Sequence, residues 1–199
     1  LPLKLLPSHV FGRFVCLLLL WLPVWLARGY VAAGVLAAPA VWLGALGINL
    51  FEGGLIDDLA RQGHQYTLIT RLTVEVPDAP EGALGQIMVE KNPLLYTWNL
   101  PVLMALLFAA DERFFSMGRM FLTYVLLLPF QAFGIALDTV KTLAFETGSD
   151  VTTQLDFAPW QMNAIALGYQ FGYLMLPFIA AAGIWILMNR ELLDTLRSQ

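Results

Sequence analysis

Cysteine, histidine and charge are all scarce in this sequence. Its 199 residues include one cysteine, Cys16, and two histidines, and charged residues make up 13% of the chain. A single cysteine excludes an intramolecular disulfide and any cysteine-rich metal site. Soluble domains usually carry about 25% charged residues, so half that share excludes an ordinary soluble domain. The net charge of −4, with no basic cluster, also excludes a nucleic-acid partner.

The two histidines give no sign of a metal or cofactor site. His9 and His64 lie far apart in the sequence, and neither has a second histidine or a carboxylate at the spacing of metal ligands. Cys16 lies in the apolar stretch "FVCLLLLW", where a small packing residue is the simplest interpretation. We therefore expect no metal and no cofactor.

What the sequence does contain is long apolar runs. Hydrophobic residues make up 58% of the chain, and the mean hydropathy is +0.68. A run of about 20 apolar residues is long enough to cross a bilayer as a helix. Such runs lie at about residues 10–27, 31–51, 92–110, 120–145 and 163–188. The sequence therefore predicts an all-α polytopic membrane protein, with residues 1–199 forming a single integral membrane domain and the first run a retained anchor.

Residues 52–93 differ in character from these runs, and near their start lies "LIDDLARQG", which predicts a short amphipathic segment. The stretch "YTLITRLTVEV", residues 66–76, alternates with a period of two and is rich in β-branched residues, which predicts a strand. One face of this strand, which we expect to be covered, carries Tyr66, Leu68, Thr70, Leu72, Val74 and Val76. The turn residues "PDAPEG" and a return strand at 85–91 complete a β-hairpin. Because an isolated hairpin is marginally stable in water, we expect it to pack on the membrane-proximal helices or on a partner. The acidic stretch 146–160 predicts a loop.

The positions of lysine and arginine predict the orientation. Basic residues flank one set of loops, whereas residues 52–93 and 146–160 are dominated by acids. Since basic loops favour the cytoplasm, both termini are expected inside and the hairpin outside. Two termini on the same side require an even number of crossings. Residues 31–51 must then lie in the interface or re-enter, which gives four transmembrane helices. If residues 31–51 cross instead, there are five.

Polar residues interrupt the fourth apolar run. Gln131, Gly134, Asp138 and Lys141 follow one another at spacings of three and four, so they share one helical face. A charge near the bilayer centre costs at least about 2.5–3.5 kcal/mol. We expect Asp138 and Lys141 to pair with each other, which lowers the cost of both.

The last apolar run offers a partner surface for this polar face. Asn163, Gln170 and Pro177 recur every seven residues. Gly168 and Gly172, at i and i+4, would allow another helix to approach closely. The polar face has two interpretations that the residues leave open: a self-neutralising pair inside a bundle, or a functional polar cavity.

Four stretches resemble a known family. They are "TRLTVEV", "VEKNPLLYTWNLPVLMALLFA", "LLLPFQAFGIALDTVKTLAFETG" and "WQMNAIALGYQFGYLMLPFIAAAGIWILMNR". Together, over roughly residues 66–190, they resemble the exosortase H-associated membrane proteins. The resemblance implies a multi-pass protein of the bacterial inner membrane that accompanies an exosortase. Exosortases are sorting enzymes whose substrates carry a C-terminal signal made of a short motif, an apolar helix and a basic end.

The resemblance marks positions in the motifs without making them catalytic. Those positions are Asn92, Pro93, Gln131, Asp138, Lys141 and Gln170. The cysteine, arginine and histidine set of an exosortase is missing, so we expect an associated protein and not the enzyme.

We expect a non-catalytic accessory subunit that binds the exosortase, the sorting-signal helix of its substrates, or both, within the bilayer. Its intramembrane binding face would comprise Gln131, Asp138, Lys141, Asn163 and Gln170. One alternative is a membrane-embedded enzyme with Asp138 as general base. Another is a transporter or ion-path component with helices broken at Pro129 and Pro177.

Overall fold

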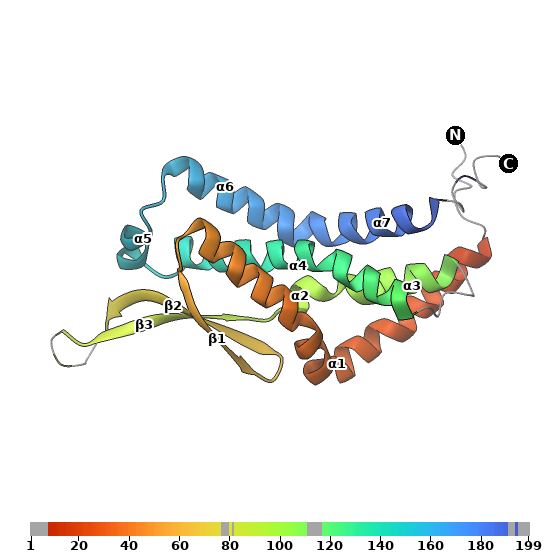
Figure 1. The fold of residues 1–199 in the computed structure, drawn as a ribbon, viewed down its shortest axis with the longest axis horizontal. Coiled ribbons are helices and arrows are strands. Elements are labelled where there is room, and N and C mark those ends of the chain that lie inside the picture. Colours follow the sequence, from red (N-terminus) through yellow and green to blue (C-terminus); the bar gives the residue numbers. More distant parts are fainter. Residues whose placement is uncertain (1–7, 77–79, 81, 111–116, 191–193, 195–199) are drawn as a thin grey trace.

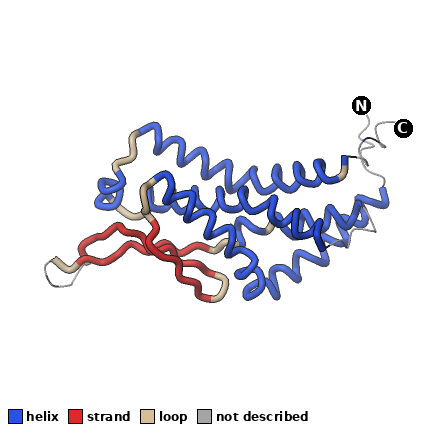
Figure 2. The backbone as a smooth tube through the Cα atoms, in the orientation of Figure 1, coloured by secondary structure: helices blue, strands red, loops and turns tan. Residues whose placement is uncertain are grey.

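The chain is mostly helical, with one small sheet (Figures 1 and 2). The structure is a computed structural model that describes residues 8–76, 80, 82–110, 117–190 and 194. The helices are α1 (Ser8–Phe51), α2 (Leu94–Thr97), α3 (Asn99–Ala110), α4 (Met117–Phe145), α5 (Ser149–Leu155), α6 (Pro159–Gln170), the π-helical η1 (Phe171–Met175) and α7 (Leu176–Met188). The strands are β1 (Ile56–Gln62), β2 (Gln65–Glu75) and β3 (Leu84–Lys91).

The first two apolar runs form one continuous helix. The sequence predicted two separate segments, and this was wrong: α1 runs through both without a break for 44 residues. At 1.5 Å per residue it is about 66 Å long, twice the hydrocarbon thickness of about 30 Å. Pro23 and Pro39 lie inside it, and the helix bends in Figure 1. A helix satisfies its own backbone hydrogen bonds, which an apolar surrounding cannot do, so continuing the helix is favourable.

The long helices run side by side, up and down the long axis of the molecule. In Figure 1, α1 leads away from one end of the molecule, α3 leads back toward it, α4 leads away again and α6–η1–α7 returns. Three helices in the described part of the chain are long and apolar enough to span a membrane: Gly34–Phe51, Met117–Phe145 and Pro159–Met188. The sequence predicted four or five crossing helices. By length and composition, three helices in the described part of the chain are long and apolar enough to cross, so four or five crossings are not confirmed.

The predicted hairpin is present and gains a third strand. Strands β2 and β3 pair antiparallel, with Tyr66 opposite Lys91 and Glu75 opposite Leu84. The first strand, β1, pairs with the free edge of β2 and gives the order β1-β2-β3. The sequence predicted a short amphipathic piece there, because "IDDLARQ" has no apolar alternation.

One face of the sheet is covered by helices. The predicted inner face of β2 is buried at Tyr66, Leu68, Thr70 and Leu72. Three helices contact it through Ala45 and Ile48 of α1, Leu143 of α4 and Val151 of α5. The prediction that this face is covered is confirmed, except that Val76 is exposed.

The prediction of a loop over residues 146–160 was wrong, because α5 forms inside it. Gln154 fixes α5 to the sheet by donating from Nε2 to the carbonyl oxygen of Thr73 at 2.8 Å.

Candidate functional site

A buried ion pair joins the sheet to the helix bundle. The Nζ of Lys91, the last residue of β3, lies 2.7 Å from Oδ2 of Asp138 in α4. It also donates to Thr142 Oγ1 at 2.7 Å and to the carbonyl oxygen of Asp138 at 3.2 Å. The side chains of Lys91 and Asp138 are 9% and 15% exposed. Three acceptors thus hold the ammonium group where little water reaches it, and such charge-assisted contacts are the strong ones.

The predicted pairing of Asp138 with Lys141 was wrong. Lys141 instead donates to Glu146 just beyond the end of α4, and its Nζ lies 4.9 Å from the centre of the Tyr169 ring. The Asp138 carboxylate faces β3, whose lysine the sequence pattern could not place. The hydrogen bond from Lys141 lowers the pKa of Glu146 below its ordinary value. The four charges near this end of α4 therefore form two neutral pairs, one buried and one half-exposed.

Three tyrosines lie beside the buried pair. The ring of Tyr96 meets that of Tyr173 edge-on at 5.8 Å, and Tyr173 stacks on Tyr169, also at 5.8 Å. Tyr96 is buried and interacts electrostatically with Asp138. The three rings come from α2, α6 and η1, so aromatic side chains line one side of the site.

Gln131 makes a separate buried contact closer to the middle of α4. Its Nε2 donates to Asn99 Oδ1 of α3 at 2.8 Å, and both side chains are almost fully buried. Its Oε1 is buried and has no hydrogen-bond partner. The sequence predicted Gln131 as a polar group of this face but missed Asn99. A lone asparagine in the apolar stretch "TWNLPV" was the available signal.

Glycines bring α4 and the last helical segment together next to the site. A Cβ on Gly134 would lie 2.6 Å from Tyr96 Cδ1 and 3.3 Å from the carbonyl oxygen of Gly172. A Cβ on Gly168 would lie 2.7 Å from Leu137 Cδ1. The predicted close approach at Gly168 and Gly172 is confirmed. The π-helical turn η1 begins at Phe171, within this crossing, and π-bulges often mark functional sites.

The motif residues Asn92 and Pro93 start α2. The Oδ1 of Asn92 accepts from the Leu94 backbone N–H at 3.1 Å, and the Pro93 carbonyl oxygen accepts from Thr97 Oγ1 at 3.1 Å. Asparagine before a helix and proline at its start are both favoured, because they satisfy or remove unpaired N–H groups. This turn connects Lys91 to Tyr96, so it positions two members of the site.

Two predicted site residues lie away from the ion pair. Asn163 and Gln170 are exposed on α6, whereas Gln131 and Asp138 face the interior and Lys141 is half-exposed. The five residues therefore do not form one face. Gln131 and Asp138 have protein partners, and the exposed amides of α6 point outward.

The Asp138 carboxylate is engaged by the ammonium group of Lys91. Among the described residues, no three His, Cys, Asp or Glu side chains are grouped so that they could hold a metal ion.

Comparison with known proteins supports the resemblance found in the sequence. No curated protein and no solved structure matches the chain. A family model described as exosortase H-associated membrane protein matches residues 8–192, which is nearly the whole chain. The apolar helices agree with the membrane location that this description implies. The chain belongs to the exosortase H-associated membrane protein family.

Proposed function

We propose that the chain is a non-catalytic accessory subunit of an exosortase-type protein-sorting system. It binds the exosortase, the C-terminal sorting-signal helix of its substrates, or both, in the plane of the membrane. The family description supports the association with an exosortase. The binding role is supported by the outward face of α6.

An exposed stripe on α6 carries this proposal. Trp160, Asn163, Leu167 and Gln170 are all exposed and follow one another at spacings of three, four and three. That spacing places them on one side of the helix, as in the seam of a coiled coil. Asparagine and glutamine at a membrane-facing position gain a hydrogen-bond partner when a second helix packs against them. We call these four residues the α6 stripe.

The polar residues inside the bundle are not available to a partner, whereas the α6 stripe is exposed. Gln131 is buried against Asn99, and Asp138 is largely buried against Lys91, so they stabilise the fold and present little to a partner. The α6 stripe replaces them as the recognition face. Asn163 and Gln170 remain from the predicted set.

The proposed topology has four transmembrane passes in the bacterial inner membrane, with both termini in the cytoplasm. The passes are α1, α2–α3, α4 and α6–η1–α7. The start of α1 and the end of α7 lie at one end of the molecule, and the sheet lies toward the other, which agrees with this count (Figure 1). Because α1 is continuous, residues 31–51 extend the first pass and need not re-enter. The sheet, within residues 52–93, then lies on the extracytoplasmic side.

The alternative functions gain no support from the described part of the chain. A general base at position 138 needs a free carboxylate beside a reactive group, and Asp138 is held by Lys91. A transporter with helices broken at Pro129 and Pro177 is not favoured either, because α4 continues through Pro129 and the helical segment continues from η1 through Pro177 into α7.

Site-specific photocrosslinking tests the α6 stripe. A benzophenone amino acid at Asn163 or Gln170 should crosslink to the exosortase or to a substrate precursor in native membranes. The same group at Leu19, which is 70% exposed on α1, is the matched control and should not. Equal crosslinking from all three positions, or crosslinking from Leu19 alone, would contradict the assignment of the stripe.

A further inference from the structure

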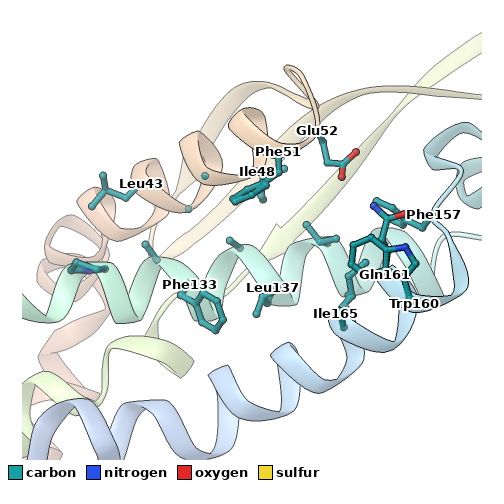
Figure 3. A pocket seen from close by; sticks show the side chains of 17 residues that line it. Leu43, Ile48, Phe51, Glu52, Phe133, Leu137, Phe157, Trp160, Gln161 and Ile165 are labelled. Atoms are coloured by element: carbon teal, nitrogen blue, oxygen red, sulfur yellow. The ribbon is translucent and has the colours of Figure 1, made fainter. Parts of the chain in front are cut away.

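A cavity lies between α1, α4 and α6, on the far side of α4 from the ion pair. Its volume is about 530 Å³, within the range of small-molecule pockets. In Figure 3 its length runs from Leu43 at one end, past Leu137 and Ile165, to Glu52 and Gln161 at the other. The body of the cavity is apolar, and its two polar side chains lie at the same end.

Small residues keep this space open. Gly44, Gly47, Ala132, Ala136 and Ala164 all line the cavity. A Cβ on Gly44 would lie 3.1 Å from the carbonyl oxygen of Ala132, so this glycine allows α1 and α4 to approach. A Cβ on Gly47 would have no atom within 4 Å. Glycine destabilises a helix interior relative to alanine, and no packing contact requires it at position 47. The effect of Gly47 is to leave room.

The shape of the cavity selects the class of occupant. The lining residues of α1 and α4 span about 15 Å along the helices at 1.5 Å per residue. The space is an elongated apolar slot with a volume of about 530 Å³. A single hydrocarbon chain is long, thin and apolar, so it matches both the shape and the lining of this slot.

The polar end selects the headgroup. Glu52 follows directly after α1, and Gln161 lies in the first turn of α6. Gln161 Oε1 accepts from the Ala158 backbone N–H at 2.8 Å, which leaves Nε2 to donate to an ester or phosphate oxygen. The guanidinium group of Arg71 is held by the carbonyl oxygens of Glu52 and Gly53, and the carboxylate of Glu52 repels a free fatty acid and attracts an ammonium group. Trp160, 70% exposed beside them, suits the headgroup region of a bilayer.

We propose that this cavity is a lipid-binding site. It takes one acyl chain of a membrane phospholipid with an amine-bearing headgroup, such as phosphatidylethanolamine. The acyl chain lies along Leu43 and Leu137, and the ammonium group reaches Glu52. The second acyl chain stays in the bilayer. This site shares Trp160 with the α6 stripe, contains none of its other three residues, and needs no exosortase.

Photolabelling in nanodiscs tests the site. The probe is phosphatidylethanolamine with a diazirine in one acyl chain, in discs of phosphatidylglycerol, and labelled peptides are mapped by mass spectrometry. We expect labels to concentrate in residues 43–52, 129–140 and 157–165. Gly47→Leu fills the cavity and should lower this labelling about tenfold. The matched control is Gly183→Leu, a glycine in α7 that also has no atom within 4 Å of its Cβ position, and it should leave labelling unchanged.

A second variant and a second probe keep the test decisive. Gly47→Ala should fold like the wild type and still reduce labelling, so it decides the matter if Gly47→Leu does not fold. Glu52→Gln should lower the preference for this probe over the same probe with a phosphatidylglycerol headgroup by about threefold or more. Labelling spread evenly around the bundle, or unchanged in both Gly47 variants, would overturn the proposal. So would displacement of the label by a peptide helix that itself crosslinks to residues 43–52.

Discussion

Lys91 Nζ lies 2.7 Å from Asp138 Oδ2, although the two residues are 47 positions apart in the sequence. The contact connects the last residue of β3 to a residue about two turns before the end of α4. Because both side chains are largely buried, the contact helps to decide how the sheet sits on the helices, and each charge depends on the other.

Removing one partner of this pair should cost more than removing both. Lys91→Met or Asp138→Leu alone leaves a buried charge without its counter-ion and should cost about 3–5 kcal/mol of unfolding free energy. The double variant should be near neutral, since an apolar pair of similar volume replaces the ions. Unfolding in mixed detergent measures all three. A double variant as unstable as the worse single variant would show that the two residues do not act as a pair.

The Lys141–Glu146 pair should contribute far less. It is partly exposed, and pairs of this kind contribute about 0.2–1 kcal/mol. Lys141→Met should therefore be milder than either change at the buried pair. A loss as large as that of Asp138→Leu would show that Lys141 has a second, buried role.

This half-exposed pair should also have a characteristic pH dependence. The pKa of Glu146 is lower in the folded protein than its ordinary value of 4.5. The pair's contribution is therefore full above pH 4.5 and is lost as the pH falls through the lower folded value. The stability difference between the wild type and Lys141→Met should shrink over that window. A difference that grows on acidification would contradict the sign.

Two glycine variants should move stability in opposite directions. Gly134→Ala places a Cβ 2.6 Å from the ring of Tyr96, and overpacking of this kind costs about 1–3 kcal/mol. Gly183→Ala meets no atom within 4 Å and should stabilise α7 by about 0.5–1 kcal/mol. Thermal unfolding in detergent compares them. Equal effects would show that the crossing at Gly134 is not tightly packed.

Cysteine labelling tests the four-pass topology. In a Cys16→Ala background, Glu75→Cys on β2 should react with an impermeant maleimide from outside. Arg190→Cys, just after α7, should react only after permeabilisation. Both positions are exposed, so accessibility on the correct side is not in question. Labelling of Glu75→Cys solely from the cytoplasm would reverse the arrangement.

Local patterns predicted the parts of the fold that depend on neighbouring residues. The hairpin followed from a period of two in β2, and the close crossing at Gly168 and Gly172 followed from small residues one turn apart. The β1 strand and α5 were missed because consecutive polar residues dominate both, and their burial depends on contacts with β2. Pairing with the adjacent strand β2 decided β1, and contact with the distant residue Thr73 helped to decide α5.

The site shows the same division. The helical face that holds Gln131 and Asp138 could be read from spacing, but their partners could not. Lys91 at a strand end has the sequence signature of a solvated edge residue, and only the packing of β3 on α4 brings it to Asp138. Lys141 lies three residues after Asp138 and could have paired with it, but Asp138 pairs instead with Lys91, 47 positions away.

The most direct test of the proposed accessory role is co-purification with the exosortase of the same cell. A tagged chain would be isolated in a mild detergent that keeps both proteins folded, beside a variant with Asn163→Leu and Gln170→Leu. The wild type should retain the exosortase or a precursor with an intact sorting signal, and the variant should lose it while remaining folded. Reproducible absence of both from the wild-type preparation, with both proteins folded, would contradict the account.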